Sequence, residues 1–547
     1  MSTLDLDPTP PARPAAEPRR ARWWWGALAG ALAVAAALAV GELVTGLIGG
    51  TSSSVVSVGE VVVENAPPWL KDYAIETFGE DDKPALIAGT TILLVVASIG
   101  LGIASVRRLW IGVAGTVAFG VIGVWAALTR PGASFSDVWP SVLGTLAAIA
   151  VLTALLRPGL LTRAALNRMA PAADRRPSPE MPAVRRPGSA PAGFDRRKFL
   201  VSAGAVAGGA VVIGSVGRSL QGRYSVSGAR SAIALPPPAS PAAVLAAGTE
   251  TGTPGISSFV TSNADFYRVD TALAVPQVDP ANWKLAIKGM VDRPMEFSFE
   301  QLLDRDLVER DITLVCVSNE VGGTYAGNAR WLGVPLASLL EEAGVQEGAD
   351  QLVSRSVDGW TAGSPTEVVM DGRDALVAVG MNGEPLPVEH GFPARLVVPG
   401  LYGFVSATKW VTELELTTFE EFDAYWLRRG WAQKAPIKTM ARIDTPRGLA
   451  KLAPGTVPIG GVAWAIHRGI SAVEVRIDDG PWQEAQLGEV PTSDTWRQWF
   501  LPWEATSGRH TIAARATDSA GEVQTEDRVE PIPDGATGWH SVVVTVT

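Results

Sequence analysis

Hydrophobic positions divide the chain into two parts. Long apolar runs occur in the first part, at Trp23 to Ile48, Pro84 to Ser105, Leu109 to Leu128 and Trp139 to Leu156. Each run is close to the ~20 residues that an α-helix needs to cross about 30 Å of hydrocarbon, and the runs have almost no polar face. They predict four transmembrane helices within residues 23–157 rather than buried core helices.

The positions of Lys and Arg predict how these helices are oriented. Short loops rich in Lys and Arg stay in the cytoplasm. Arginines precede the first run, two more separate the second and third runs, and a dense series extends from Arg157 to Lys198. The loop from Gly50 to Lys83 is mostly acidic. Residues 1–22 are therefore predicted to be a cytoplasmic tail, and five crossings place everything after about Arg218 outside.

The fifth apolar run, Phe199 to Val216, is shorter and richer in Gly and Ala than the others. It belongs to "DRRKFLVSAGAVAGGAVVIG", in which Arg196 and Arg197 precede the apolar stretch. This pattern is typical of a twin-arginine export signal, here inside the chain, but two arginines also flank many membrane helices. Residues 198–217 are therefore either a fifth transmembrane helix or a twin-arginine-like signal anchor.

Two segments rich in Pro, Ala, Ser and Gly follow the apolar runs. Residues 158–197 and 218–258 contain too few large apolar residues to form a core, and predict a cytoplasmic and an extracytoplasmic linker. From about Phe259 the pattern changes to short alternating strands with a few helical segments, which predicts an α+β domain over 259–425. Residues 426–547 carry almost only strand signals and predict an immunoglobulin-like β-sandwich without a disulfide.

Composition excludes several classes of site. The net charge of −10 makes nucleic acid an unsuitable partner, and the single cysteine excludes an intrachain disulfide, a four-thiolate iron–sulfur cluster and a C-x-x-C-H haem site. No histidine precedes His390, so the apolar runs cannot hold haem through histidine. Electrons would pass to or from a separate protein or a quinone. Glu42 is the one clear carboxylate within the first run, either a functional site or a group that reaches the headgroups.

The single cysteine, Cys316, lies at the end of an apolar run in "DITLVCVSNEVGG". Ile312 and Leu314 share its face of the predicted strand, so the simplest interpretation is a buried free cysteine that acts as a small hydrophobic residue. The alternative is a metal ligand. One protein thiolate is sufficient for a soft or high-valent metal if an organic cofactor supplies the other sulfur ligands.

Three longer stretches carry a resemblance to a known family. They are "TLVCVSN", "ARWLGVPLASLLEEAGV" and above all "MNGEPLPVEHGFPARLVVPGLYGFVSATKW". In these stretches the chain resembles the sulfite-oxidase family of molybdenum enzymes, over about Phe259 to Thr547. The resemblance implies that Cys316 ligates molybdenum, that molybdopterin supplies the remaining sulfur ligands, and that the C-terminal sandwich is a dimerisation domain, which allows a homodimer.

The cofactor's phosphate needs cations and a planar hydrogen-bonding partner. "HGFPAR" and a later lysine supply His390, Arg395 and Lys409 in one compact unit. The resemblance further implies that three residues face the cofactor, namely Tyr267, Arg268 and Ser406. The remaining histidines are expected to be ordinary surface or packing residues of the sandwich: His467, His510 and His540.

The chain departs from the family at positions that concern the substrate. Asp270 stands where sulfite oxidases have an arginine that would hold sulfite, and a carboxylate would repel a dianion in a pocket of low dielectric. Trp360 takes the place of a tyrosine near the metal. The spacing from Arg395 to Lys409 is one residue longer than usual. An uncharged substrate such as a sulfoxide therefore fits at least as well as sulfite, in either reaction direction.

Together these features predict a membrane-anchored, extracytoplasmic molybdenum-molybdopterin oxidoreductase that transfers an oxygen atom to or from a small sulfite- or sulfoxide-like substrate. Because molybdopterin is inserted in the cytoplasm, export of an already folded domain favours the twin-arginine interpretation of Arg196 and Arg197. The alternative is a cofactor-free binding or scaffold protein that retains the fold, since fold alone does not fix function.

Overall fold

The computed structural model describes residues 23–49, 54–66, 77, 82–129, 135–156 and 196–547. The chain divides into two compact units, Met1–Tyr224 and Ser225–Thr547, which we call the helical unit and the catalytic unit. The predicted cytoplasmic tail and nearly all of the predicted cytoplasmic linker lie outside the described residues.

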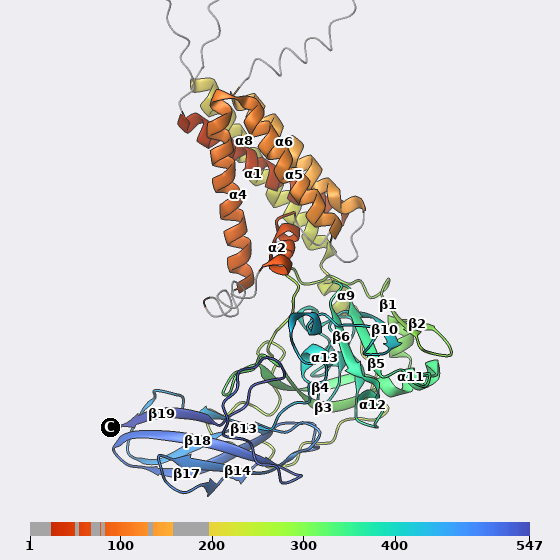
Figure 1. Ribbon diagram of the computed structural model, residues 1–547, viewed down its shortest axis with the longest axis vertical. Helices are drawn as coiled ribbons and strands as arrows, with labels where there is room; N and C mark the ends of the chain where they lie inside the picture. The colour runs from red at the N-terminus through yellow and green to blue at the C-terminus, as the bar shows by residue number, and fades with distance from the viewer. Residues whose placement is uncertain (1–22, 50–53, 67–76, 78–81, 130–134, 157–195) are drawn as a thin grey trace, which may run out of the picture. The chain divides into compact units, whose positions relative to one another are not determined.

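The helical unit consists of long apolar helices (Figure 1). The described elements are α1 (Trp23–Ile48), α2 (Ser54–Asn65), α4 (Asp82–Arg107), α5 (Leu109–Thr129), α6 (Trp139–Leu156) and α8 (Arg196–Gln221). Among the described residues, five helical stretches are long and apolar enough to cross a membrane, and they correspond to the five predicted runs. Helix α2 was not predicted, because its acidic surroundings obscured a short run rich in valine.

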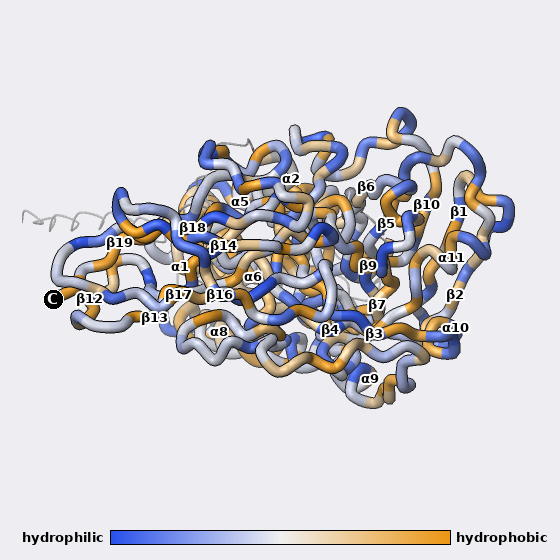
Figure 2. Tube along the Cα trace, turned by 90° about the horizontal axis from the view of Figure 1, so that it is seen from below, coloured by the Kyte–Doolittle hydropathy of each residue, from blue (hydrophilic) through white to orange (hydrophobic). Residues whose placement is uncertain are grey.

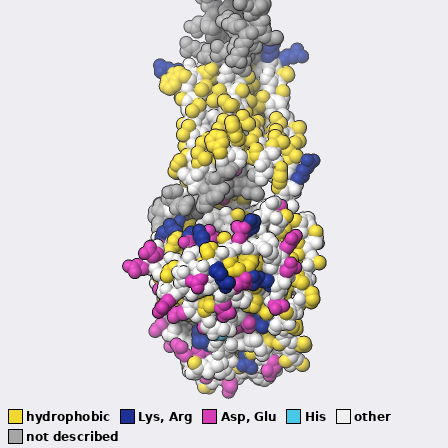
Figure 3. All heavy atoms as spheres, turned by 90° about the vertical axis from the view of Figure 1, so that its right-hand side faces the viewer, with side chains coloured by type: hydrophobic (Ala, Val, Ile, Leu, Met, Phe, Trp, Pro, Cys, Tyr) yellow, Lys and Arg dark blue, Asp and Glu magenta, His cyan; other side chains and the backbone are white. Residues whose placement is uncertain are grey.

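Hydrophobic side chains cover much of the surface of the helical unit (Figure 3). Leu93, Trp110, Val121 and Val211 are each more than half exposed. Exposed apolar surface on this scale is unusual for a protein in water. This surface is compatible with membrane association.

Small residues allow the helices to approach closely. A Cβ atom on Gly30 of α1 would collide with the backbone of Ser98 in α4, and one on Gly102 would collide with Gly26. Close backbone approach at glycine is a common packing mode of membrane helices.

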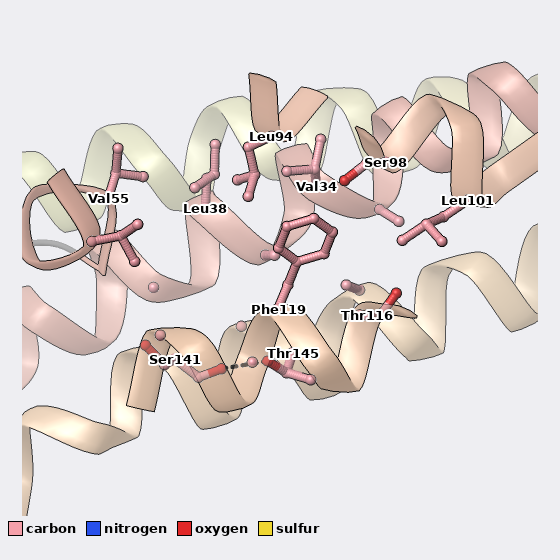
Figure 4. Close-up of a pocket in the computed structure, with 18 of the residues that line it drawn as sticks. Val34, Leu38, Val55, Leu94, Ser98, Leu101, Thr116, Phe119, Ser141 and Thr145 are labelled. Atoms are coloured by element: carbon pink, nitrogen blue, oxygen red, sulfur yellow. Dashed lines mark hydrogen bonds between the residues drawn. The ribbon is translucent and has the colours of Figure 1, made fainter. Parts of the chain in front are cut away.

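A pocket of about 960 Å³, partly open, lies between α1, α2, α4, α5 and α6. Phe119 lies beside it, together with the hydroxyls of Thr116 and Thr145 (Figure 4). These two hydroxyls donate to backbone carbonyls of their own helices, to Gly112 at 2.8 Å and to Ser141 at 2.7 Å. The pocket is therefore mainly apolar, and the hydroxyl donors of Thr116 and Thr145 are already used.

The first part of the catalytic unit contains two five-stranded sheets (Figure 1). One has the order β2-β1-β10-β5-β6, with β2 (Met295–Ser298), β1 (Lys284–Gly289), β10 (Val411–Thr417), β5 (Gln351–Ser356) and β6 (Thr361–Pro365). The other has the order β3-β4-β7-β8, with β9 paired to β7; its strands are β3 (Val308–Val315), β4 (Ala326–Pro335), β7 (Leu376–Met381), β8 (Glu384–Pro385) and β9 (Arg395–Val397). Four short helices connect them: α10 (Phe299–Leu303), α11 (Leu336–Ala343), α12 (Thr366–Val369) and α13 (Gly403–Ser406).

Local sequence signals explain where these helices begin and end. Ser298 and Gln301 form a capping box at the start of α10, and Gly344 ends α11 with a φ of 74°. Strand β7 is buried along its whole length, which matches its uninterrupted apolar sequence. Polar residues gather in the outer loops near β1, β2 and α10 (Figure 2).

The last part of the catalytic unit is built from two further sheets. One has the order β11-β13-β17-β16, from β11 (Met440–Thr445), β13 (Gly455–Trp464), β17 (Arg497–Ala505) and β16 (Gln486–Leu487). The other has the order β12-β19-β18-β14-β15, from β12 (Lys451–Leu452), β19 (His540–Val546), β18 (Gly508–Asp518), β14 (Ile470–Ile477) and β15 (Gln483–Glu484). Their buried residues, such as Trp499, Val473 and Val544, form one core. The sheet-rich C-terminal region is as predicted, and its assignment to the immunoglobulin type stays a prediction.

Residues 225–258 differ from the predicted linker because they pack onto the catalytic unit. Arg230, in α9 (Ser227–Ala232), donates to the carbonyls of Pro385 and Leu386 at 2.6 and 2.8 Å. Ser240 forms a β-bridge with Val308. Apolar side chains such as Leu235 and Ile256 also pack against the core of the catalytic unit. Because these side chains are few and lie among Pro, Ala, Ser and Gly, the hydropathy pattern does not reveal this packing.

Candidate functional site

Cys316 follows β3 directly and lies in the turn that leads to β4. Its N–H donates to the carbonyl of Tyr325 at 2.9 Å, and the side-chain oxygen of Asn319 accepts from the N–H of Tyr325 at 2.8 Å. These bonds hold the turn closed. The thiol is free and only 8% exposed, and it lines a pocket.

The pocket encloses about 890 Å³, part of it open to solvent. That volume suits a cofactor or small-molecule site. Its walls come from segments far apart in sequence: residues 266–271, the turn at 316–318, the turn between β5 and β6, residues 390–410, and two tryptophans near 430. Five of the seven predicted site residues line it, namely Tyr267, Cys316, His390, Arg395 and Lys409.

Arg268 and Ser406 are not among the lining residues. Arg268 is ion-paired with Asp270 at 2.9 Å, and its side chain is 36% exposed. The hydroxyl of Ser406 is fully buried and donates to the carbonyls of Tyr402 and Leu401, at 3.0 and 3.2 Å. Their predicted contact with the cofactor stays a prediction.

Arg395 is a buried cation without a carboxylate partner among the described residues. It is 5% exposed; its Nη1 donates to the carbonyl of His390 at 3.1 Å, and its guanidinium lies 5.1 Å from the ring centre of Trp331. Burial lowers the pKa of Arg395 to about 10, which leaves it charged at neutral pH. A buried charge needs a counter-ion. The position therefore suits an anionic ligand.

Lys409 is balanced by the protein itself. Its Nζ lies 2.6 Å from Asp270 and 3.2 Å from the carbonyl oxygen of Glu389. Burial lowers the pKa of Lys409 to about 8, although Asp270 opposes the shift. Asp270, which the sequence placed in a sulfite-holding position, is thus held between Arg268 and Lys409 rather than standing alone in the pocket.

Two further lining groups are neutral hydrogen-bonding residues. Nε2 of His390 lies 3.0 Å from the carbonyl oxygen of Asn263, which assigns the proton to that nitrogen. Burial, reinforced by Arg395, lowers the pKa of His390 to about 4, so it is neutral at pH 7. Burial raises the pKa of the Tyr267 phenol, which therefore stays protonated.

Burial also raises the pKa of the Cys316 thiol, against hydrogen bonds from Ser318. Among the described residues no cluster of three or more His, Cys, Asp or Glu could hold a metal ion. A metal at Cys316 would therefore take most of its ligands from a cofactor.

Sequence reasoning missed part of the pocket wall. Phe404, Trp426 and Trp431 all line the pocket, and Trp426 and Trp431 lie beyond the predicted end of the domain at residue 425. Asp358 also lines it, beside the predicted Trp360. The dense aromatic run "FDAYWLRRGW" is the signal that could have extended the domain.

Residues 272–426 match the family model described as an oxidoreductase molybdopterin binding domain. An uncharacterized oxidoreductase of Bacillus subtilis, YuiH, is 36% identical over 153 residues, which cover 28% of this chain and 74% of that protein. The chain belongs to the family of molybdopterin-binding oxidoreductases. The predictions of the sulfite-oxidase relationship, of an enzyme and of a molybdenum-molybdopterin cofactor are thereby confirmed.

Other molybdopterin-binding oxidoreductases align over a longer stretch. Human mitochondrial sulfite oxidase is 29% identical over 345 residues, which cover 53% of this chain and 62% of that protein. The chain thus spans about three fifths of the length of that relative. The sulfane dehydrogenase SoxCD from Paracoccus pantotrophus is a solved structure that is 25% identical, with a TM-score of 0.47 and coverage of 53% of this chain and 84% of that one.

Proposed function

We propose that the protein is a membrane-anchored, extracytoplasmic molybdenum-molybdopterin oxidoreductase that transfers an oxygen atom to or from a small sulfite- or sulfoxide-like substrate. One observation carries the proposal: the thiol of Cys316 shares a pocket with Arg395, a buried cation without a carboxylate partner among the described residues. These are the groups that a metal and an anionic cofactor require.

The chain's own residues divide the work of binding. Cys316 offers its sulfur to the metal, and Arg395 and Lys409 offer cations to the cofactor's phosphate. His390 and Tyr267 supply neutral hydrogen bonds that orient the pterin without adding charge. When bound, the cofactor supplies two-electron oxygen-atom transfer at molybdenum.

The helical unit supports the membrane anchor. Its five apolar helices and exposed apolar side chains match the dimensions and the solvent of a bilayer. The distribution of Lys and Arg in the sequence supports an extracytoplasmic catalytic unit, and Arg196-Arg197 at the start of α8 support twin-arginine export. Replacing both arginines by lysine should block export of the catalytic unit. Protease added outside spheroplasts should then no longer cleave it.

All four histidines of the chain belong to the catalytic unit, so the helices offer no histidine for haem. We therefore propose a separate redox protein or a quinone as electron partner. An immunoglobulin-like C-terminal sandwich would serve as the surface of a homodimer.

Metal analysis tests the proposed function. The full-length protein, expressed in a host that makes molybdopterin and purified in detergent, should contain about one molybdenum per chain and should turn over with a redox dye. Cys316→Ala should abolish both turnover and bound molybdenum, while the chain keeps its fold by circular dichroism. Absence of molybdenum from the wild-type protein, or its retention with full turnover in Cys316→Ala, would reject the proposal.

A further inference from the structure

Two groups of residues with different chemistry stand out in the lining of the Cys316 pocket. The first holds the cations and neutral hydrogen-bonding groups that suit the cofactor: Tyr267, His390, Arg395 and Lys409. The second consists of four aromatic side chains, which we call the aromatic wall: Trp360, Phe404, Trp426 and Trp431. No member of the aromatic wall carries a charge, so this wall offers no cation to an inorganic oxyanion.

Three rings of the aromatic wall contact one another. Trp431 lies between its neighbours, with ring centres 5.7 Å from Phe404 and 6.0 Å from Trp426. Phe404 is 9% exposed, and both tryptophans are half-buried against the main core of the catalytic unit. Rings fixed in this way form a rigid apolar surface, which binds apolar or aromatic groups with little loss of side-chain entropy.

A carboxylate adjoins the aromatic wall. Asp358 lines the pocket, and its side chain accepts a hydrogen bond from the N–H of Trp360 at 3.1 Å. The structure gives Asp358 no ion pair within residues 196–547, in contrast to Asp270, which has two cationic partners. Once an anionic cofactor uses Arg395 and Lys409, the charged residues that remain in the pocket lining are two carboxylates, Asp270 and Asp358. An anionic substrate is therefore disfavoured there.

We infer that the substrate of this site is an uncharged organic sulfoxide, or the corresponding sulfide, whose apolar substituent packs against Trp426, Trp431 and Phe404. In the reducing direction a sulfoxide, two electrons and two protons give a sulfide and water; the reverse reaction needs an electron acceptor. This inference rests on the proposed function and narrows its substrate class. Sulfite and other inorganic oxyanions are excluded by Asp358 and by the lack of a cation on the aromatic wall.

Equilibrium dialysis of unreactive ligands gives a readout that does not depend on turnover. We would compare methyl phenyl sulfone, dimethyl sulfone and sulfate with the molybdenum-loaded full-length protein in detergent. Methyl phenyl sulfone should bind at least about tenfold more tightly than dimethyl sulfone, because only the phenyl group can pack on the rings. Sulfate should not compete. Equal binding of the two sulfones, or competition by sulfate, would overturn the inference.

Substitutions of Trp431 test whether the phenyl group binds at the aromatic wall. Trp431→Ala should reduce the preference for the phenyl ligand to below about threefold, and Trp431→Leu, which keeps an apolar side chain, covers the case in which alanine disturbs folding. The matched control is Trp482→Ala, because Trp482 lies just before β15 in the C-terminal region, outside the pocket lining. A preference that survives both Trp431 variants would place the phenyl group elsewhere and reject the inference.

Asp358→Asn tests the exclusion of anions. This change should let sulfate compete measurably, whereas Asp479→Asn, at an exposed position, should not. Turnover then separates the two proposals. Molybdenum-loaded protein that oxidises sulfite with ferricyanide, but shows no phenyl preference, would uphold the proposed function and reject the substrate class; protein without molybdenum would reject the function itself.

Discussion

The surroundings of Arg395 and of Lys409 differ, although both cations line the same pocket. Lys409 is paired at 2.6 Å with Asp270, which also binds Arg268, so its charge is balanced without any ligand. Arg395 has only backbone carbonyls and an aromatic face around it, among the described residues. A buried charge of this kind weakens the fold unless something else neutralises it. The comparison indicates that Arg395 is kept for a ligand, whereas Lys409 is part of a network that also stabilises the pocket itself.

The largest expected effect that separates the two cations is that of Arg395→Met. Hydrogen bonds to a charged group contribute about 1.5–3 kcal/mol, so retention of the cofactor should fall about 10- to 100-fold. The cofactor-free protein should be no less stable, because a buried unpaired charge has been removed. Pterin content and hydrogen exchange of peptides from the catalytic unit would measure the two effects.

The control for this change is Arg293→Met, at an exposed position that does not line the pocket. It should leave pterin content unchanged. If Arg395→Met destabilised the cofactor-free unit while pterin retention stayed normal, Arg395 would be a structural residue, and its contrast with Lys409 would disappear.

Lys409→Met should give a smaller loss of cofactor and a larger loss of stability. After the lysine is removed, Asp270, whose side chain is 4% exposed, keeps its ion pair with Arg268. Breaking a buried pair costs about 3–5 kcal/mol when the remaining charge is unpaired, and the partner that remains should reduce this to roughly half. Hydrogen exchange of the cofactor-free variants checks whether Lys409→Met loses more stability than Arg395→Met. The double change Lys409→Met with Asp270→Asn should restore most of the stability, and failure to do so would contradict the pairing.

Local patterns predicted the parts of this site that lie close together in sequence. His390, Arg395 and Lys409 lie within one stretch of 20 residues, and Cys316 ends an apolar strand, so a motif was enough to find them. The balancing of Lys409 by Asp270 could not be predicted, because 139 residues separate the pair. Trp426 and Trp431 were missed for a related reason. They follow the last strand of their sheet in a segment with little regular structure, so periodicity gave no indication that they return to the pocket.

The same limit applies to the fold. The apolar runs predicted the long helices well, because hydrocarbon-spanning length is a local property. The packing of residues 225–258 was not predicted, because Arg230 and Ser240 make contacts to partners far away in sequence. Hydropathy indicates which segments are buried from water, and it gives little information about the distant backbone groups that a segment binds.

The effect that should be smallest at neutral pH is that of the buried histidines, and it extends the comparison from paired and unpaired cations to histidines. His540 lies against Gly322, in the turn that follows Cys316, and its Nδ1 accepts from the N–H of Ile443 at 2.9 Å. Burial, followed by the charge of Arg442, lowers the pKa of His540 to about 4. The folded state therefore stays unprotonated at His540 between about pH 6.5 and pH 4, while the unfolded state binds a proton. Stability must fall as pH falls through this window, by up to about 3 kcal/mol for this one group. Because His390 also has a pKa lowered to about 4, His540→Gln should remove only about half of the pH dependence, measured by hydrogen exchange at several pH values.

His510→Gln should act in the opposite direction, since hydrogen bonds to Asp478 and Thr506 raise the pKa of His510. The loss of His510 removes a contribution that favours the folded state at low pH. If both substitutions shifted the profile in the same direction, the distinction between a histidine buried as a neutral acceptor and one paired with a carboxylate would not hold for this protein.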